Sequence, residues 1–242
     1  MQALLARCLL RIAALPPLRV VHGCAGLIGR LLWHLPTRER ANTRLNLQLC
    51  FADYSDSERT ELGRRSLQES TKATAELGWF WRRPPQDLLP YIQPGEGQQL
   101  LRDAIDAGRG LVVLAPHLGA WEISTLVLQQ QLPQDQQPLY LYRPPRRQAL
   151  EPLIRAARQR YGAELAPVTA AGMRQVLAAL RQGRVIGVLP DQEPDPANGV
   201  FAPFFGVPAN TMTLVSRLLQ KSGATPLFLA IERLPGLSLI HI

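Results

Sequence analysis

Short apolar runs alternate with helical patterns from residue 111 to residue 231, and this alternation restricts the fold more than any other feature of the chain. Each run has the length of a buried strand, and turn-forming residues bound it. Strands are expected at Val112–Ala115, Leu139–Tyr142, Glu164–Val168, Val185–Leu189 and Pro226–Ile231. Helices are expected at Trp121–Gln131, Gln148–Tyr161, Ala171–Gln182 and Thr211–Ser222. The pattern predicts an α/β fold with a largely parallel sheet flanked by helices.

The composition fits one sizeable domain with a basic surface. The chain has 242 residues, of which 46% are hydrophobic and 19% charged, enough for a single α/β core preceded by a short helical segment. Its formal net charge of +8 suits a nucleic acid, an anionic membrane surface or a phosphorylated substrate. The arginines form no dense run interleaved with aromatic residues, and the chain has no zinc-finger, helix-turn-helix or RNP pattern. We therefore expect no nucleic-acid partner.

Residues 1–35 are apolar, but arginines interrupt them before they reach the length of a membrane span. Pro16 and Pro17 divide the segment into two short helices. Polar and small residues share one side of the second helix, namely Arg19, His22, Gly23, Gly26, Arg30 and His34. We interpret residues 1–35 as a membrane-associated helical segment in the bilayer interface, facing anionic headgroups. Helices packed on the core are the alternative, and residues 36–242 form the main domain.

The stretch before the first strand is mainly helical. A helix is expected over Arg38–Phe51. A capping-box pattern at Ser55–Glu58 predicts a second, long helix, which Arg82–Pro85 ends. A further helix around Gln98–Ala107 leads into the first strand of the alternating region.

A histidine follows that first strand, and an acid follows the histidine at a spacing suited to general-base chemistry. His117 lies at the carboxyl end of the strand, where open α/β sheets place their ligand sites. Gly119 allows the chain to turn into a helix whose first turn carries Glu122. We expect the carboxylate to hold one ring nitrogen of His117, which leaves the other nitrogen to accept a proton from a hydroxyl. A loop histidine beside a solvated glutamate is the alternative.

Two more polar residues follow strands that end at the same edge of a parallel sheet. Arg143 follows the strand ending at Tyr142, and Asp191 follows the strand ending at Leu189. An arginine there can bind a phosphate or carboxylate through two hydrogen bonds, or pair with the acid of the dyad. A turn or cap role for Asp191 fits the sequence equally well.

An apolar aromatic segment, Gly199–Thr211, precedes the last expected helix. Left exposed, such a segment would favour aggregation, so we interpret it as the lining of a groove for an apolar ligand. Burial in the core is the alternative.

Several segments, taken together, resemble the lipid A biosynthesis acyltransferases (the lauroyl and myristoyl transferases), which belong to the wider glycerolipid and lysophospholipid acyltransferase group. The resemblance covers nearly the whole chain, and the ordered set is more specific than any one segment. Besides the basic, apolar amino-terminal helices, the matching segments are Arg44–Phe51, Glu76, His117-x4-Glu122, Tyr142–Pro144, Pro190–Gln192 and Phe201–Gly206. Glutamate in place of the aspartate usual in the glycerolipid branch favours the lipid A branch.

The resemblance implies transfer of a fatty acyl chain from acyl carrier protein to a hydroxyl of a lipid A precursor, at the cytoplasmic face of the bacterial inner membrane. His117 would remove the hydroxyl proton and Glu122 would orient the ring, with no metal and no organic cofactor. By the same resemblance Arg143 and Asp191 line the site. The groove for the acyl chain or the acceptor would be shaped by Phe204, Phe205 and Gly206. The basic surface would meet acceptor phosphates, the acidic carrier protein and the anionic membrane surface.

The final residues, 235–242, differ from the family pattern, so we expect the domain to be truncated at its carboxyl end. Two alternative functions are consistent with the sequence. One is acyl transfer to another glycolipid, such as a phosphatidylinositol mannoside; the other is a non-catalytic lipid-binding protein of the same fold. The sequence sets neither the acyl chain length nor the hydroxyl that is acylated.

Overall fold

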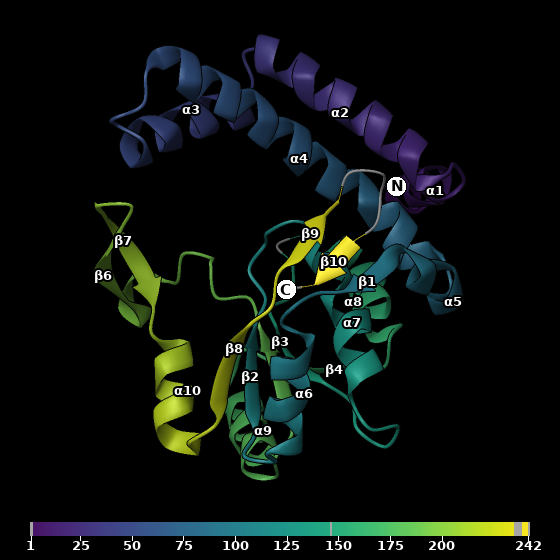
Figure 1. Cartoon of the computed structure of the whole chain (residues 1–242), viewed down its shortest axis with the longest axis vertical. Helices are drawn as coiled ribbons and strands as arrows, with labels where there is room; N and C mark the ends of the chain where they lie inside the picture. The colour runs from purple at the N-terminus through teal and green to yellow at the C-terminus, as the bar shows by residue number, and fades with distance from the viewer. Residues whose placement is uncertain (1, 146, 235–238, 242) are drawn as a thin grey trace.

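The computed structural model describes residues 2–145, 147–234 and 239–241, and its centre is a parallel sheet (Figure 1). The sheet has five strands in the order β4-β3-β5-β2-β8. Their bounds are β2 Leu111–Leu114, β3 Leu139–Tyr142, β4 Glu164–Pro167, β5 Val185–Val188 and β8 Thr225–Phe228. All neighbouring strands in it are parallel. The predicted α/β fold with a parallel sheet is therefore confirmed.

Helices cover both faces of this sheet because its central strands are apolar on both sides. Successive residues of β2 point in opposite directions, so that Leu111 and Val113 enter one core and Val112 and Leu114 the other. Helix α6 Gln98–Asp106 precedes β2 in the chain. The helices that follow β2 are α7 Ser124–Gln131, α8 Glu151–Gln159, α9 Ala170–Arg181 and α10 Leu214–Ser222. The first core contains side chains of α4, α6 and α7, and the second contains side chains of α9 and α10. The alternation read from the sequence thus produces two packed layers on one sheet.

The amino-terminal helices form a separate layer beyond the carboxyl ends of the strands (Figure 1). They are α1 Gln2–Ala14, α2 Leu18–His34, α3 Arg38–Cys50 and α4 Asp56–Arg82, followed by the short α5 Pro85–Leu88. Helix α2 packs closely along α4. A Cβ atom added at Gly29 would lie only 2.5 Å from the backbone of Gln68, so this contact requires glycine. Among the described residues, no helix has both the length and the apolar content that crossing a bilayer requires.

The orientation of α2 differs from the one expected. His22 was assigned to a headgroup-facing side, but it is buried against α4 together with Val21, Ala25 and Trp33. Large apolar side chains lie exposed on the outside of the layer instead, including Leu27, Ile28 and Leu31 on α2 and Leu9 and Ile12 on α1. The reason is packing: Gly29 and Trp33 fit against Gln68 and Gly63 of α4, and Leu18 is buried as well, so Leu27, Ile28 and Leu31 lie on the remaining face of α2.

Two segments fold differently from the sequence prediction. Gly199–Thr211 is an antiparallel hairpin of β6 Gly199–Phe204 and β7 Val207–Met212, so the next helix begins later than expected. The expected strand Pro226–Ile231 is split: β8 ends at Phe228, and β9 Ile231–Arg233 joins a separate sheet.

That smaller sheet has three strands in the order β1-β10-β9, where β1 is Ile92–Pro94 and β10 is Leu239–His241. The expectation about the final residues falls largely on residues 235–238 and 242, which lie outside the described residues. The short 3-10 helices are η1 Leu89–Tyr91, η2 Trp121–Ile123, η3 Gln148–Leu150 and η4 Pro196–Asn198.

Candidate active site

The loop that carries His117 leaves the carboxyl end of β2 and is held by backbone contacts on two sides. The backbone N–H of Ala115 donates to the carbonyl of Val188 on β5 (2.9 Å). The N–H of Ala120 donates to the carbonyl of Ile231 on β9, also at 2.9 Å. Gly119 between them has a φ of +61°, and a Cβ there would fall 1.9 Å from the Ile231 oxygen. Only glycine therefore allows the loop to approach β9 this closely.

Asp191 holds His117 by two hydrogen bonds. The Nδ1 atom of His117 lies 2.9 Å from Oδ1 of Asp191, and the backbone N–H of His117 donates to Oδ2 at 2.8 Å. The two residues follow neighbouring strands, β2 and β5, which places them at the same edge. A carboxylate accepts only, so Nδ1 carries the proton and donates, and Nε2 presents its lone pair. The side-chain amide of Gln192 lies 3.4 Å from that Nε2, and the ring of Trp121 packs 4.5 Å from the imidazole.

The contact with His117 sets the charge of Asp191. Partial burial by itself raises the pKa of Asp191, but the hydrogen bonds from the His117 ring and backbone outweigh it and hold the pKa below its ordinary value. Asp191 is therefore ionised at neutral pH and favours a positive charge on the ring.

Glu122 does not form the hydrogen bond to His117 that the spacing predicts. Its Oε1 accepts from the indole N–H of Trp81 on α4 (3.0 Å) and lies 3.6 Å from Nε of Arg158 on α8. No hydrogen bond joins it to His117 within the described part of the chain, and its Oε2 has no hydrogen-bond partner there. The cause is local: the chain turns as the 3-10 helix Trp121–Ile123, which directs the carboxylate into the core, while Asp191 occupies Nδ1. The expected His117–Glu122 hydrogen bond is thus replaced by one to Asp191.

The surroundings of Glu122 make its charge costly. Burial raises the pKa of the Glu122 carboxyl, and the charges of Arg158 and His117 and the Trp81 hydrogen bond only partly oppose this. Glu122 thus interacts with His117 through its charge, without a hydrogen bond between the two side chains.

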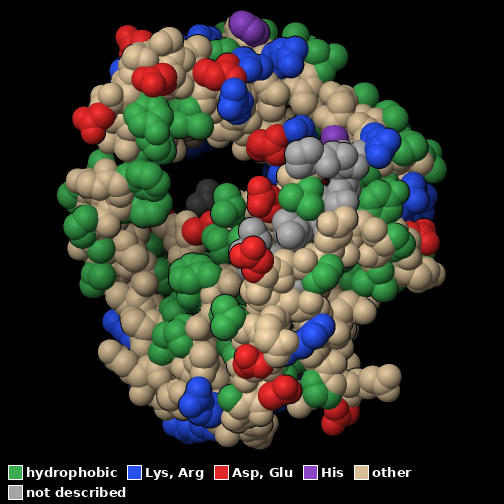
Figure 2. Space-filling view, in the orientation of Figure 1, with side chains coloured by type: hydrophobic (Ala, Val, Ile, Leu, Met, Phe, Trp, Pro, Cys, Tyr) green, Lys and Arg blue, Asp and Glu red, His purple; other side chains and the backbone are tan. Residues whose placement is uncertain are grey.

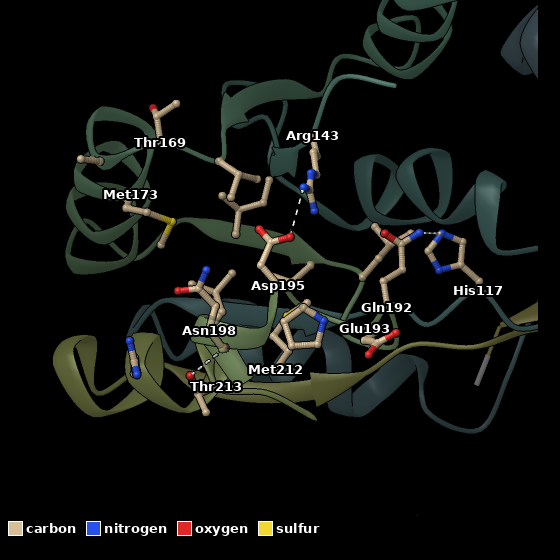
Figure 3. A pocket seen from close by; sticks show the side chains of 18 of the residues that line it. His117, Arg143, Thr169, Met173, Gln192, Glu193, Asp195, Asn198, Met212 and Thr213 are labelled. Carbon is tan, nitrogen blue, oxygen red and sulfur yellow. Dashed lines mark hydrogen bonds and ion pairs between the residues drawn. The ribbon is translucent and has the colours of Figure 1, made fainter. Parts of the chain in front are cut away.

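A cavity of about 480 Å³ opens in front of His117 (Figure 3). His117 and Gln192 lie at one end, and Thr169 and Met173, from the start of α9, lie at the other (Figure 3). Its apolar lining comes from Leu141, Val168, Met173, Val188, Leu189, Pro194, Met212 and Leu214. Arg143 lines the cavity, and its guanidinium lies 3.6 Å from the Asp195 carboxylate. Arg158 and Arg217 add two further guanidinium groups to the wall.

These features agree with a comparison to known sequences. The family model of bacterial lipid A biosynthesis acyltransferases matches residues 2–237 of the chain. The chain belongs to this family. The His117-x4-Glu122, Arg143 and Asp191 segments that carried the resemblance all lie at or beside the cavity.

Individual relatives from this family are distant. Compared with Escherichia coli (strain K12) proteins, the chain is 28% identical to the lipid A biosynthesis palmitoleoyltransferase over 209 residues, 26% to the lauroyltransferase over 205 and 23% to the myristoyltransferase over 203. These alignments cover 83–85% of this chain and 61–65% of the relatives. The chain thus spans less than two thirds of the length of these three relatives.

The aromatic segment that the acyltransferase resemblance assigned to the groove lies elsewhere. Phe204, Phe205 and Gly206 form the tip of the β6–β7 hairpin, and none of them lines the cavity. The Phe204 and Phe205 rings are exposed, and Phe205 packs 5.2 Å from Phe51 at the end of α3. Figure 2 shows apolar side chains on both sides of an opening between this hairpin and the helical layer. Phe204, Phe205 and Gly206 are thus not part of the cavity in front of His117, and their role in shaping a groove for the acyl chain or the acceptor stays a prediction.

Sequence reasoning missed three side chains of the site: Trp81 and Arg158 beside Glu122, and Arg217 on the cavity wall. Arg158 contacts Glu122 from α8, and Trp81 contacts it from α4, 41 residues away in the chain. Within the described residues, no three His, Cys, Asp or Glu side chains are grouped so that they could hold a metal ion.

Proposed function

We propose that the chain is an acyltransferase that moves a fatty acyl chain from acyl carrier protein to a hydroxyl of a lipid A precursor. The observation that carries the proposal is the state of His117: Asp191 fixes its Nδ1, and its Nε2 is directed at the cavity beside Gln192. Such a ring is oriented to accept a proton. Membership of the family supports the reaction and the lipid A precursor.

In the proposed mechanism, Nε2 of His117 takes the proton of the acceptor hydroxyl while that oxygen attacks the thioester carbonyl. The tetrahedral intermediate then collapses, the carbon–sulfur bond breaks, and the leaving thiolate takes the proton back from Nε2. The ring is thus positively charged only between the two proton transfers, and general-base assistance of this kind contributes on the order of 10²–10⁴-fold. No nucleophilic serine or cysteine is required.

Both carboxylates favour the charged ring, in different ways. Asp191 touches it and fixes the tautomer. Glu122 acts through space, because a buried negative charge nearby stabilises an imidazolium that it does not touch. We therefore assign the orienting role to Asp191 and an electrostatic role to Glu122.

The binding residues follow from the composition of the cavity. Its apolar lining suits an acyl chain, whereas Arg143, Arg158 and Arg217 suit the phosphates of the acceptor or of the donor. The exposed leucines of α1 and α2 support a membrane-associated segment in residues 1–35, beside an acyltransferase domain in residues 36–242. We place the protein at the cytoplasmic face of the bacterial inner membrane, with acyl carrier protein as the soluble partner.

The test is transfer in detergent micelles from lauroyl- or myristoyl-carrier protein to a tetra-acylated lipid A precursor, comparing the wild type with His117→Ala. Transfer by the wild type and its near-total loss in the variant would support both the substrate class and the base. Equal transfer by both proteins would refute the mechanism. A wild type that binds the precursor without acylating it would support the non-catalytic alternative, and transfer only to a phosphatidylinositol mannoside would identify the other glycolipid.

A further inference from the structure

A buried ionic cluster lies behind the His117 loop, outside the cavity. Its centre is Glu76 of α4, whose side chain is fully enclosed. The carboxylate accepts from Nε and Nη2 of Arg233, both at 2.7 Å, and lies 2.5 Å from Nε2 of His22. These three residues come from α4, β9 and α2, so the cluster joins the helical layer to β9.

Arg233 extends the cluster to the loop that carries the base. Its Nη2 also donates to the carbonyl of Gly119 at 2.9 Å, and its Nη1 donates to Glu69 at 3.1 Å. Residue 119 is two positions after His117, and the next residue, Ala120, is bonded to Ile231 of the same strand. Strand β9 therefore holds the loop twice, once through its backbone and once through the Arg233 side chain.

The Glu76 carboxyl at the centre of the cluster is ionised at neutral pH. Burial alone raises the pKa of Glu76, but the bonds from Arg233 and His22 outweigh it and hold that pKa below its ordinary value. A buried ion pair of this kind contributes little net stability, because its desolvation offsets the attraction. A guanidinium that bonds a carboxylate with two groups and still reaches a carbonyl does, however, fix geometry strongly.

We propose that Arg233 is a positioning residue for His117: it holds the Gly119 carbonyl against Glu76 and so fixes the loop that directs Nε2 into the cavity. The catalytic part of this proposal depends on the function proposed above. The structural part, that Arg233 immobilises the loop, does not.

The variant that tests this is Arg233→Lys, which keeps the charge facing Glu76 but replaces the two guanidinium nitrogens that bond Glu76 and the Gly119 carbonyl by a single nitrogen without the planar geometry. Arg184→Lys is the matched control. Through Nη2, Arg184 bonds one oxygen of the Glu164 carboxylate (2.7 Å) and the Gln137 carbonyl (3.1 Å), so it also joins an acid to a backbone carbonyl, but at the amino end of the sheet, away from His117. Glu76→Gln is the second variant, because it keeps the enclosed shape and removes the charge.

The first readout is independent of turnover: amide hydrogen exchange of residues 118–121 and the imidazole Cε1–Hε1 NMR signal of His117. We expect faster exchange in this loop and a displaced or broadened His117 signal in Arg233→Lys and in Glu76→Gln, and neither in Arg184→Lys. Unchanged loop exchange and an unchanged ring signal in a folded Arg233→Lys protein would overturn the proposal, whether or not the wild type transfers acyl chains.

The second readout is kinetic. We expect Arg233→Lys to lower kcat by about 10- to 100-fold with little change in KM, because a small misplacement of the base affects the reaction more than binding. In a His117→Ala background the same substitution should have almost no further effect on kcat. A loss of the same size in that background would show that Arg233 acts by another route and would overturn the positioning role.

Discussion

The molecule contains two histidine–carboxylate pairs in opposite surroundings. In His117–Asp191, the side chains are 28% and 38% exposed, and Nε2 of His117, beside the Gln192 amide, is directed at a cavity. In His22–Glu76, the side chains are only 9% and 1% exposed, and the helical layer and Arg233 surround them. The same two chemical groups therefore serve in one place as a candidate base and in the other as an internal support.

The comparison teaches that access, rather than the presence of the pair, determines what such a pair can do. Proton transfer to a substrate requires a ring nitrogen that the substrate can reach. A pair that substrate cannot reach can act only through its neighbours, and Glu76 has such a neighbour in Arg233, which contacts the loop of the other pair. The two pairs are therefore linked through Gly119.

The largest effect should come from alanine at each histidine in turn. We expect His117→Ala to lower kcat/KM by about 10²–10⁴-fold with little effect on stability, because the ring is partly exposed. His22→Ala should instead lower the free energy of unfolding by about 1–3 kcal/mol, since it removes a hydrogen-bond partner from the buried Glu76 carboxylate. Transfer kinetics and denaturant unfolding of both variants would test this contrast. Equal losses of stability in the two would break the comparison.

The next effect separates the two acids near His117. We expect Asp191→Asn to lower kcat by about 100-fold or more, because the amide can donate to Nδ1 and so favour the wrong ring tautomer. Glu122→Gln should lower kcat only about fivefold, because a charge acting at a distance changes the activation free energy by roughly 1 kcal/mol. A pH–rate profile for each variant would test the assignment. If Glu122→Gln caused the larger loss, the orienting role would belong to Glu122, as the spacing first indicated.

A smaller effect concerns Arg143. Its guanidinium is exposed and only loosely paired with Asp195, so we expect Arg143→Ala to leave stability within about 0.5 kcal/mol of the wild type. If it contacts a phosphate, KM for the phosphorylated substrate should rise about 5- to 20-fold with kcat little changed. Titration of KM at increasing salt would sharpen this, because the difference between the wild type and the variant should shrink. A kcat loss with unchanged KM would contradict a binding role.

The sequence was sufficient to predict the sheet and the edge on which the base lies. Apolar strand lengths and strand ends are local signals, so Leu139–Tyr142 agrees with the structure residue for residue and Val185–Leu189 to within one residue. The identity of the residue that bonds His117 could not be predicted from local sequence. Asp191 is 74 residues away in the chain, and the 3-10 turn that directs Glu122 inward has no distinct sequence pattern.

Long-range contacts and one unusual turn explain the remaining errors. Glu76 meets His22 across 54 residues and Arg233 across 157, a meeting that no spacing rule predicts. The β6–β7 hairpin turns at Phe205 and Gly206, both with positive φ (51° and 77°). Such a turn favours asparagine or glycine at its first position, and phenylalanine there concealed it. The segment therefore looked like a groove lining rather than a hairpin with an exposed tip.

The smallest effect we expect concerns the pH dependence of stability, which should have opposite signs for the two buried acids Glu76 and Glu122. Bonds from Arg233 and His22 lower the pKa of Glu76, so its contribution to stability is present above the pKa of the unfolded chain and is lost as pH falls through the folded value. Burial raises the pKa of Glu122, so the wild type instead loses stability as pH rises from the unfolded value through the folded one. Relative to the wild type, Glu76→Gln should therefore be most destabilised at neutral pH and recover in acid, whereas Glu122→Gln should gain relative stability as pH rises. Thermal unfolding between about pH 3 and pH 8 would test both slopes, and slopes of equal sign would mean that folding shifts the pKa of both acids in the same direction.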